Sequence, residues 1–334
     1  MTDQHRPGEP SPPAGDTFFA AIDELPEVQE GAPTEVTPDA AVATAGAGEL
    51  PGRQASLWSD AWRQLRRSPM FLVSSAIILL FVVMAIAPGL FTSQDPRDCD
   101  LSRSLLRPSA GHWFGYDIQG CDYFTRVIYG ARVSIVIGIL VSGLATLIGV
   151  VLGSMSGYYG GLRDSVIARI TDIWFAIPTI LGAIVILTTF GSNRGLAQVS
   201  LVLIVLGWPT ILRLMRSMVL SVKELDYVQA ARALGASNLR ILRRHILPNA
   251  MAPVIVYATI TVGIVIEAEA TLSFLGVGLQ LPSISWGLMI SVAQTRILRA
   301  PHLLLFPAIF LSVTVFSFIL LGDALRDALD PKLR

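Results

Sequence analysis

Residues 227–249 read YVQAARALGASNLRILRRHILPN, a cationic and alanine-rich segment that stands between two apolar runs. Each flanking run is long enough to cross a bilayer, whose hydrocarbon core of about 30 Å takes about 20 residues of helix. The small side chains of Ala230, Ala231 and Ala233 would let another surface approach closely. The segment therefore favours a protein-docking loop in a membrane protein, although amphipathic helices that rest on anionic lipid fit the same pattern.

The capping residues divide this loop into two helices. Asp226 can cap a short helix, and Gly235 can adopt the left-handed conformation that ends it. Ser237 can then cap a second helix, which Pro248 would close. The sequence therefore predicts two short helices joined at an angle over residues 226–248.

Apolar runs of membrane-crossing length recur through the rest of the chain. Five of them carry few or no ionised side chains and span residues 71–91, 133–157, 196–212, 252–275 and 303–322. A sixth run, 166–190, is interrupted only by Arg169 and Asp172, which lie within one helical turn and can form an ion pair. Pro178 in the same run removes a backbone hydrogen bond and should bend the helix. Because backbone polar groups in lipid must bond within the chain, we expect an all-α polytopic membrane protein with six transmembrane helices.

Basic residues set the orientation that we expect. Of the 24 Lys and Arg residues after position 52, 16 fall in segments that are cytoplasmic if the N-terminus is cytoplasmic. The positive-inside rule therefore places both termini and the two-helix loop 226–248 in the cytoplasm. The expected divisions are a tail (1–52), an interfacial helix (53–70), the first crossing (71–91), an extracytoplasmic loop (92–132), a core of five helices that includes the two-helix loop (133–322) and a cytoplasmic C-terminus (323–334).

The first 52 residues differ in composition from the rest of the chain. They hold ten acidic residues against one Arg or Lys, and eight of the 20 prolines. With too few large apolar side chains to bury a core, this acidic, Pro- and Ala-rich segment should be a disordered cytoplasmic tail. After it, the stretch SLWSDAWRQLRRSP (56–69) predicts a helix at the membrane interface, with one apolar face formed by Leu57, Trp58, Trp62 and Leu65.

Gly149, Gly153 and Gly157 recur every four residues in the second predicted crossing. They form one ridge along which another helix can approach closely, because glycine has no side chain to keep two backbones apart. Helix packing is therefore the purpose that we expect, while the lining of a pore is the alternative that this spacing leaves open.

Sequence signatures of an enzyme are missing. The phosphate-binding motif G-x-x-x-x-G-K-[ST] does not occur in the chain. The four histidines are scattered over the tail, two outer segments and the 226–248 loop, and they show no set of convergent metal ligands. We therefore expect no catalytic residue, no metal site and no bound nucleotide in this chain.

At the 226–248 loop the chain resembles the inner-membrane permeases of ABC importers that depend on a substrate-binding protein. Their signature, the EAA loop, runs Glu-Ala-Ala, three residues, Gly, nine residues and then His-x-Leu-Pro or a close variant. The residues that fall on this register are Gln229, Ala230, Ala231, Gly235, His245, Leu247 and Pro248. The resemblance implies that the loop couples the permease to an ATPase. Because Gln229 replaces the acid, a charge-assisted contact from that position is lost.

Other phrases narrow the resemblance to the C type permease of the dipeptide, oligopeptide and nickel importers. The stretch GYDIQGCDYFTRVIYGARVS (115–134) matches the outer loop of that family, except that Cys121 stands where arginine is usual. Further family-like phrases are SGYYGG (156–161), ITDIWFAIP (170–178), EATLSFLGVG (269–278) and LLGDALRDALDP (320–331). Together they cover residues 57–334, and the acidic tail has no counterpart in the family pattern.

The resemblance implies a permease subunit that forms half of a translocation path for peptides delivered by an extracytoplasmic binding protein. The implied partners are a homologous second permease, one or two cytosolic ABC ATPases that hold ATP and magnesium, and membrane lipid, with no nucleic acid. It also implies the inner or plasma membrane of a prokaryote, crossed several times. Nickel complexes or other small solutes remain alternative cargoes. A secondary transporter and a membrane scaffold remain alternatives of a different class.

Glu267 and Glu269 are acidic residues within the 252–275 run. Ionisable groups are costly in lipid and usually face a partner or a cavity. Residues two apart on a helix point to nearly opposite sides, so both acids can hardly face the same cavity. We expect one of them to receive a positive charge on the path, either a peptide amine or a neighbouring arginine.

Cys99 and Cys121 both fall in the loop assigned outside the membrane, where thiols can remain oxidised. A disulfide between them would close a loop of about 20 residues and stabilise the fold by about 3 kcal/mol, while two free thiols are the alternative. Four aromatic residues of the same loop suit either docking of a binding protein or packing against the helix tops, namely Trp113, Phe114, Tyr116 and Phe124.

Overall fold

The computed structural model describes residues 57–191 and 194–329. The expected tail, residues 1–52, lies outside these ranges, as do residues 53–56 and 330–334. The regular elements of the described part are helices, joined by turns, short 3₁₀ segments and isolated β-bridges.

Five helices in the described part are long and apolar enough to cross a membrane. They are α2 (Pro69–Ile86), α3 (Tyr123–Tyr159), α6 (Leu196–Val222), α9 (Leu247–Phe274) and α11 (His302–Leu329). The pair α4 (Gly161–Phe175) and α5 (Thr179–Thr189) adds a sixth if the two, bent by 84°, are one span. The predicted fold class, an all-α polytopic membrane protein, is confirmed.

Several crossing helices extend beyond the apolar runs that predicted them. The runs 133–157, 196–212 and 303–322 belong to helices that cover 123–159, 196–222 and 302–329. A helix satisfies its own backbone in water as well as in lipid, so it continues until a cap or a turn ends it. Asp122 provides such an end for α3, because its Oδ1 accepts a hydrogen bond from the amide of Thr125 at 2.8 Å. The last ten residues of the expected outer loop are therefore helical, as is most of the expected C-terminal segment.

The first two predicted elements end earlier than expected. The interfacial helix α1 covers Leu57–Leu65, and Ser68 caps the following helix, with its Oγ accepting a hydrogen bond from the amide of Phe71. α2 ends at Ile86 instead of residue 91, because Pro88 cannot donate the hydrogen bond that would continue the helix.

The third crossing is broken at the proline, as its position predicted. α4 ends at Phe175, and Pro178 occupies the cap position of α5. The indole of Trp174 donates a hydrogen bond to the carbonyl oxygen of Val205 in α6 at 2.7 Å, which ties the break to its neighbour. The break lies where irregular backbone must be covered by protein or line a cavity.

The predicted pairing of Asp172 with Arg169 is wrong. Oδ1 of Asp172 lies 2.8 Å from Nη2 of Arg213 in α6, which is a partner 41 residues along the chain. Because α4 packs beside α6, a longer-range arginine competes with the one on the same helix. About two turns nearer the start of α4, Asp164 also binds an α6 arginine, since both of its oxygens accept hydrogen bonds from Arg216 at 2.7 Å.

The glycine ridge lets α3 and α6 lie in close contact. A Cβ atom on Gly149 would lie 2.8 Å from the side chain of Ile211, and one on Gly153 would lie 2.6 Å from the carbonyl oxygen of Leu212. A Cβ atom on Gly157 would meet the α6 backbone as well, at 2.9 Å. Any larger residue at these positions would force the two helices apart. α9 packs on the other flank of α3 and in turn contacts α11.

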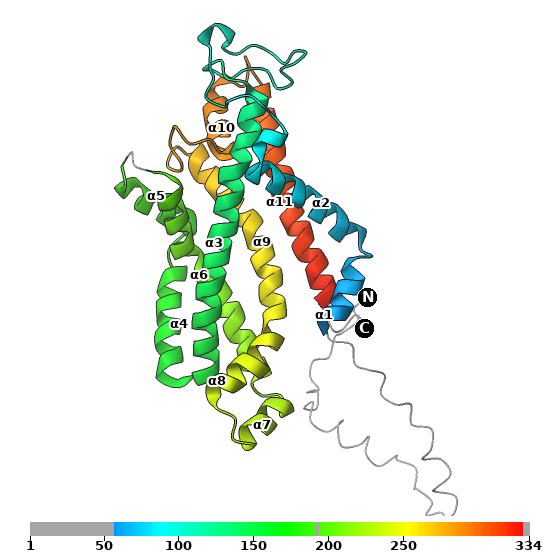
Figure 1. Cartoon of the computed structure of the whole chain (residues 1–334). Helices are drawn as coiled ribbons and strands as arrows, with labels where there is room; N and C mark the ends of the chain where they lie inside the picture. Colours follow the sequence, from blue (N-terminus) through cyan, green and yellow to red (C-terminus); the bar gives the residue numbers. More distant parts are fainter. Residues whose placement is uncertain (1–56, 192–193, 330–334) are drawn as a thin grey trace, which may run out of the picture. The chain divides into compact units, whose positions relative to one another are not determined.

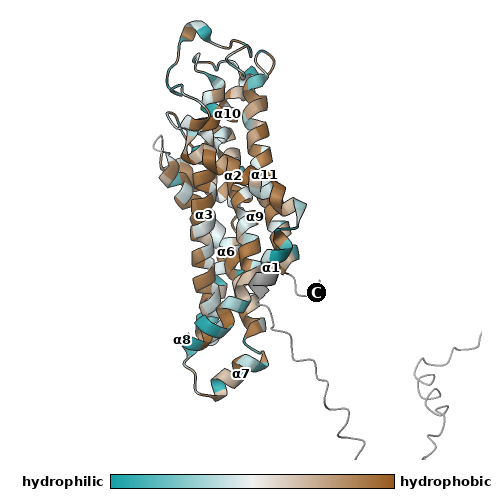
Figure 2. Cartoon of the chain, turned by 45° about the vertical axis from the view of Figure 1, so that its right-hand side comes forward, coloured by the Kyte–Doolittle hydropathy of each residue, from teal (hydrophilic) through white to brown (hydrophobic). Residues whose placement is uncertain are grey.

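Figure 1 shows the two ends of this bundle, and Figure 2 shows that polar residues gather at both. At one end lie the short helices α7 (Asp226–Ala233) and α8 (Asn238–Ile241). At the other end lie the 92–122 loop and a further short helix, α10 (Trp286–Ala293). The helices between the two ends are coloured mostly as hydrophobic in Figure 2, as a membrane-spanning bundle requires.

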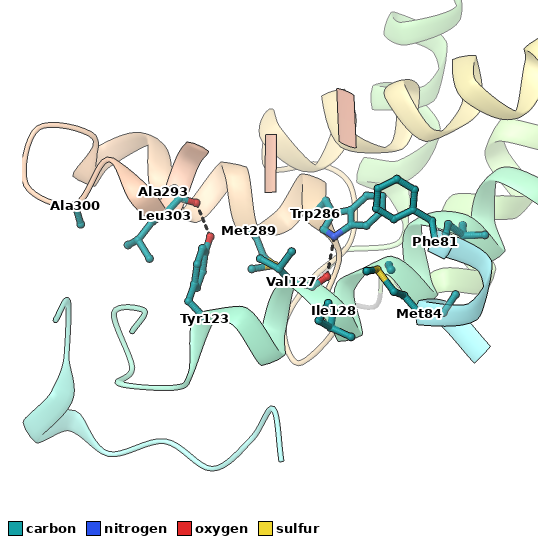
Figure 3. Close-up of a cluster of buried hydrophobic side chains, with 13 residues drawn as sticks. Phe81, Met84, Tyr123, Val127, Ile128, Trp286, Met289, Ala293, Ala300 and Leu303 are labelled. Carbon is teal, nitrogen blue, oxygen red and sulfur yellow. Dashed lines mark hydrogen bonds between the residues drawn. The ribbon is translucent and has the colours of Figure 1, made fainter. Parts of the chain in front are cut away.

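The sequence analysis did not predict α10, and its first residue is the largest fully buried side chain of the described part. The indole of Trp286 donates a hydrogen bond to the carbonyl oxygen of Val127 in α3 at 2.9 Å (Figure 3). Phe81 of α2 meets the same indole edge to face, with ring centroids 5.7 Å apart. In the same cluster, the hydroxyl of Tyr123 donates a hydrogen bond to the carbonyl oxygen of Leu303. α10 therefore joins α2, α3 and α11 at this end of the bundle.

Candidate functional site

The loop that predicted the fold forms the tip of the bundle at the α7 end. α7 ends at Ala233, and two residues later Gly235 has a φ of +80°, which lies in the left-handed region that favours glycine. A Cβ atom at this position would meet nothing within 4 Å, so the requirement for glycine is conformational and not steric. We call residues 226–248 the coupling tip.

Two local predictions for the coupling tip are wrong. Asp226 is the first residue of α7 and makes no capping hydrogen bond, because Leu225 occupies the cap position. Its charge still lies in the first turn, where it favours the helix dipole. Pro248 does not close a second short helix either, because it lies in the first turn of α9, directly after a π-helical turn.

The second helix of the coupling tip is continuous with the fifth crossing. α8 passes into a π-helical turn at Leu242–Ile246, where the amide of Leu247 bonds to the carbonyl oxygen of Leu242. The turn then continues as α9 without a loop. Residues 238–274 therefore form one helical rod. π-helical turns inside helices often mark functional positions.

α7 is held against this rod by one buried side chain and a hydrogen bond. Val228 is fully buried in a cluster that includes Ile241 and Ile246. The hydroxyl of Tyr227 donates a hydrogen bond to the carbonyl oxygen of His245 at 3.4 Å, and burial raises the pKa of this hydroxyl. A displacement of α7 must therefore act on the start of α9.

The outward surface of the coupling tip combines apolar and basic side chains. Leu234 is 89% exposed, Leu239 is also exposed, and Ala230 and Ala233 leave room beside them. The exposed arginines around them are Arg232, Arg240, Arg243 and Arg244. An exposed leucine surrounded by small and basic residues suits insertion into an acidic-edged cleft of a protein.

Gln229, which stands where the family motif has an acid, makes a bond that an ionised acid cannot make. Its Nε2 donates a hydrogen bond to the carbonyl oxygen of Lys223 at 3.1 Å. Lys223 caps the C-terminal end of α6, where backbone carbonyls lack helical partners. Gln229 therefore links α7 to α6. Of the other motif residues, Ala231 is half-buried beside the tip's cluster and His245 is half-buried at the π-helical turn.

The two acids of α9 lie in different surroundings. Glu269 is fully buried, and its Oε1 accepts hydrogen bonds from Oγ of Ser273 at 2.8 Å and from Oγ of Ser285 at 3.0 Å. Its Oε2 has no hydrogen-bond partner among the described residues. Ser285 also caps α10, so Glu269 anchors α10 to α9. Glu267 is exposed on the outer surface of the bundle, so only it is placed to face a path or another subunit.

The 92–122 loop is closed on itself. The structure joins Cys99 and Cys121 in a disulfide bond. Asp117 and Arg126 form an ion pair beside it. The ring of Phe114 stacks on Phe306 of α11 with centroids 3.8 Å apart, which fixes the loop to the helix tops.

The aromatic residues of this loop therefore divide between the two roles that the sequence left open. Phe114, Tyr116 and Phe124 are at least partly buried, and both phenylalanines pack beside α2, α3, α10 and α11. Trp113 packs edge to face on Phe124, with ring centroids 5.3 Å apart, but it is 68% exposed and so can also contact a partner.

Comparison with protein families gives two matches. A family described as binding-protein-dependent transport system inner membrane component matches residues 149–334. A second, described as the N-terminal TM domain of oligopeptide transport permease C, matches residues 56–108.

Curated proteins similar to this chain include three permeases. The oligopeptide transport system permease protein OppC of Bacillus subtilis is 41% identical over 88% of this chain and 96% of its own length. The dipeptide transport system permease protein DppC of the same species is 41% identical over 84% of this chain and 87% of its own length. The glutathione transport system permease protein GsiD of Pectobacterium atrosepticum is 38% identical over 83% of this chain and 92% of its own length.

Among solved structures, the inward-facing MetNI methionine ABC transporter has a chain that resembles this one with a TM-score of 0.51. The match covers 61% of this chain and 96% of that chain, at 21% sequence identity. At this identity the likeness supports the fold alone.

Proposed function

This chain belongs to the family of binding-protein-dependent transport system inner membrane components, and we propose that it is a permease subunit of an ATP-driven importer of peptides. The observation that carries this proposal is the identity of 41% to oligopeptide and dipeptide permeases over more than four fifths of the chain. A permease for glutathione, itself a tripeptide, is also similar. In this proposal the chain is the transport subunit, and a partner subunit hydrolyses ATP.

The coupling tip is the proposed docking site for a cytosolic ABC ATPase, and that partner would hold the ATP and magnesium. The exposed Leu234, the small alanines and the four arginines give it a surface that suits a protein cleft. Movement of α7 would pass through Val228 to the rod of residues 238–274. One or two ATPase subunits complete the importer.

The opposite end of the bundle is the proposed docking site for an extracytoplasmic binding protein. The disulfide and the stacked Phe114 fix the 92–122 loop, while Leu101 is 76% exposed and Trp113 is also exposed. A rigid loop with exposed apolar side chains is suited to binding another protein. A homologous second permease would supply the other half of the path.

The distribution of basic residues supports an orientation with both termini and the coupling tip in the cytoplasm of a prokaryote, and the bundle in its inner or plasma membrane. Lipid would contact α1 and the residue that follows it, Arg66, whose guanidinium lies 4.7 Å from the centre of the Trp62 ring. Such a basic and aromatic pair is typical of the membrane interface.

Purification of the tagged chain with its membrane partners tests the proposal. We expect an ATPase that carries G-x-x-x-x-G-K-[ST] to copurify, identified by mass spectrometry. In vesicles, its hydrolysis rate should rise when a peptide-loaded binding protein is added, and peptide should accumulate. Peptide uptake that needs an ion gradient and no ATPase would contradict the proposal and indicate a secondary carrier.

A further inference from the structure

The half of α6 next to the coupling tip carries a stripe of exposed polar side chains. Between residues 210 and 222, the exposed positions of α6 are Thr210, Arg213, Ser217 and Ser221. Their spacing of three or four residues places them on one face of the helix, and they extend over about 17 Å at 1.5 Å per residue. We call these four residues the polar stripe.

The polar stripe faces away from α3. The α6 side chains that contact the glycine ridge, such as Ile211 and Met215, lie on the opposite face of the helix. α3 itself presents a different surface, because its exposed residues between 133 and 157 are all apolar or glycine. The face of α3 is therefore suited to lipid, whereas the face of α6 with the polar stripe is not.

The polar stripe lies between two flanking helices. On one flank, Arg213 forms its ion pair with Asp172 of α4, and its guanidinium carbon lies 3.8 Å from the centre of the Phe175 ring. On the other flank, Leu214 lines an open groove of about 420 Å³, together with residues of α9 such as Tyr257 and with Arg326 of α11. The polar stripe therefore has α4 beside Arg213, and the neighbouring residue Leu214 faces α9.

The Asp172–Arg213 pair has little protection from its surroundings. The side chains of Arg213 and Asp172 are 51% and 54% exposed. The pair also stands beside the break between α4 and α5, where backbone groups lack helical partners. An ion pair and a broken helix are expensive against lipid tails, so this face requires water or a polar partner.

We infer that the polar stripe is a wall of the translocation path and that Arg213 and Asp172 receive the charged ends of a peptide as it passes. The inference rests on the proposed function, because it assumes a peptide cargo. An exposed ion pair contributes little stability, so a ligand that offers equivalent charges can open it. A peptide with free ends offers a carboxylate to Arg213 and an ammonium group to Asp172, so each charge keeps an opposite partner.

The access of water to the polar stripe is measured with single cysteine substitutions in the assembled importer. Ser217→Cys places a thiol on the polar stripe. Leu147→Cys places one on the exposed apolar face of α3 and is the matched control. A charged, membrane-impermeant methanethiosulfonate reagent, present on both sides of the membrane, should modify Ser217→Cys at least about tenfold faster, because thiolates react only where water reaches them. Equal rates, or an unreactive Ser217→Cys, would overturn the inference.

The role of Arg213 is measured by import and hydrolysis together, with tri-alanine as the cargo. Arg213→Gln should lower tri-alanine import about tenfold, because it removes one charge-assisted hydrogen bond to the peptide. ATP hydrolysis stimulated by the binding protein should stay within about twofold of the wild-type rate. Arg169→Gln is the control, because Arg169 is an exposed arginine on α4 and the ion-pair partner of Asp172 is Arg213; this variant should change neither rate.

The two readouts separate the possible failures. Unchanged import by Arg213→Gln, or an equal loss of import and hydrolysis, would assign Arg213 no role or only a structural one. A wild-type complex without stimulated hydrolysis would instead remove the proposed function itself.

Discussion

Glu267 and Glu269 show how two acids on one helix acquire different tasks. Glu269 bonds to the hydroxyls of Ser273 and Ser285, and it thereby connects the fifth crossing to α10. Glu267 points away from that contact and is exposed. Removal of the first should therefore affect the fold, and removal of the second should affect transport.

Glu269→Ala should lower the melting temperature of the purified complex by about 5 °C. The substitution removes two buried hydrogen bonds, each worth about 1 kcal/mol or more, and leaves two serine hydroxyls without an acceptor. The matched variant Glu267→Ala should melt within about 1 °C of the wild type while it reduces peptide uptake. Thermal unfolding followed by size-exclusion chromatography measures the melting temperatures of the two variants, and vesicle assays measure their peptide uptake. Equal shifts for the two variants would show that Glu269 does not anchor α10.

At the scale of single residues, periodicity predicted part of this arrangement. Residues two apart on a helix point to nearly opposite faces, and Glu267 and Glu269 do so. Periodicity could not show which face is covered, because the covering element is α10. For the same reason it paired Asp172 with Arg169, since the choice of Arg213 depends on which helix packs beside α4.

Between the coupling tip and the opposite end of the bundle, a single helical rod extends from Asn238 to Phe274. A push on α7 reaches this rod through Val228 and the Tyr227–His245 hydrogen bond. The rod carries Glu269 near its far end, where α10 is attached. The coupling tip and α10 are therefore connected by one element, with the π-helical turn as its irregular part.

Gly235→Val should uncouple ATP hydrolysis from uptake. Valine at a φ of +80° is strained by about 1–2 kcal/mol, so the turn after α7 should change direction. Uptake per ATP hydrolysed, measured in vesicles, should fall about tenfold or more. Gly235→Asn is the matched control, because asparagine tolerates the left-handed conformation, and it should retain most of the coupling. Full coupling in the valine variant would show that the bend is not required.

At the scale of elements, the long apolar helices were predictable and the short ones were less so. Residues 286–293 are too few to cross a membrane, so a search for apolar runs passes over α10. Two cues were present, namely Ser285 as a cap and Trp286 as a large apolar residue. The continuity of α8 with α9 was hidden by Pro248, which was interpreted as a stop although proline is tolerated in the first turn of a helix.

The surfaces proposed to bind other proteins lie at the two ends of the bundle, and the helix contacts that hold the bundle together lie in its middle. The coupling tip occupies one end, and the disulfide-closed loop with α10 occupies the other (Figure 1). The middle is held by the close approach of α3 and α6 along the glycine ridge. The order of the crossings followed from the apolar runs, but the neighbours of each helix did not, because helix packing depends on side chains far apart in the sequence.

The central claim is that the ATPase binds the end of the bundle formed by the coupling tip. Photo-crosslinking tests this claim most directly. A benzophenone amino acid is placed at position 234 in one complex and at position 101 in another, because Leu234 and Leu101 are 89% and 76% exposed at opposite ends of the bundle. Irradiation should join position 234 to the ATPase and should give no ATPase adduct from position 101. An ATPase adduct from position 101 and none from position 234 would contradict the claim.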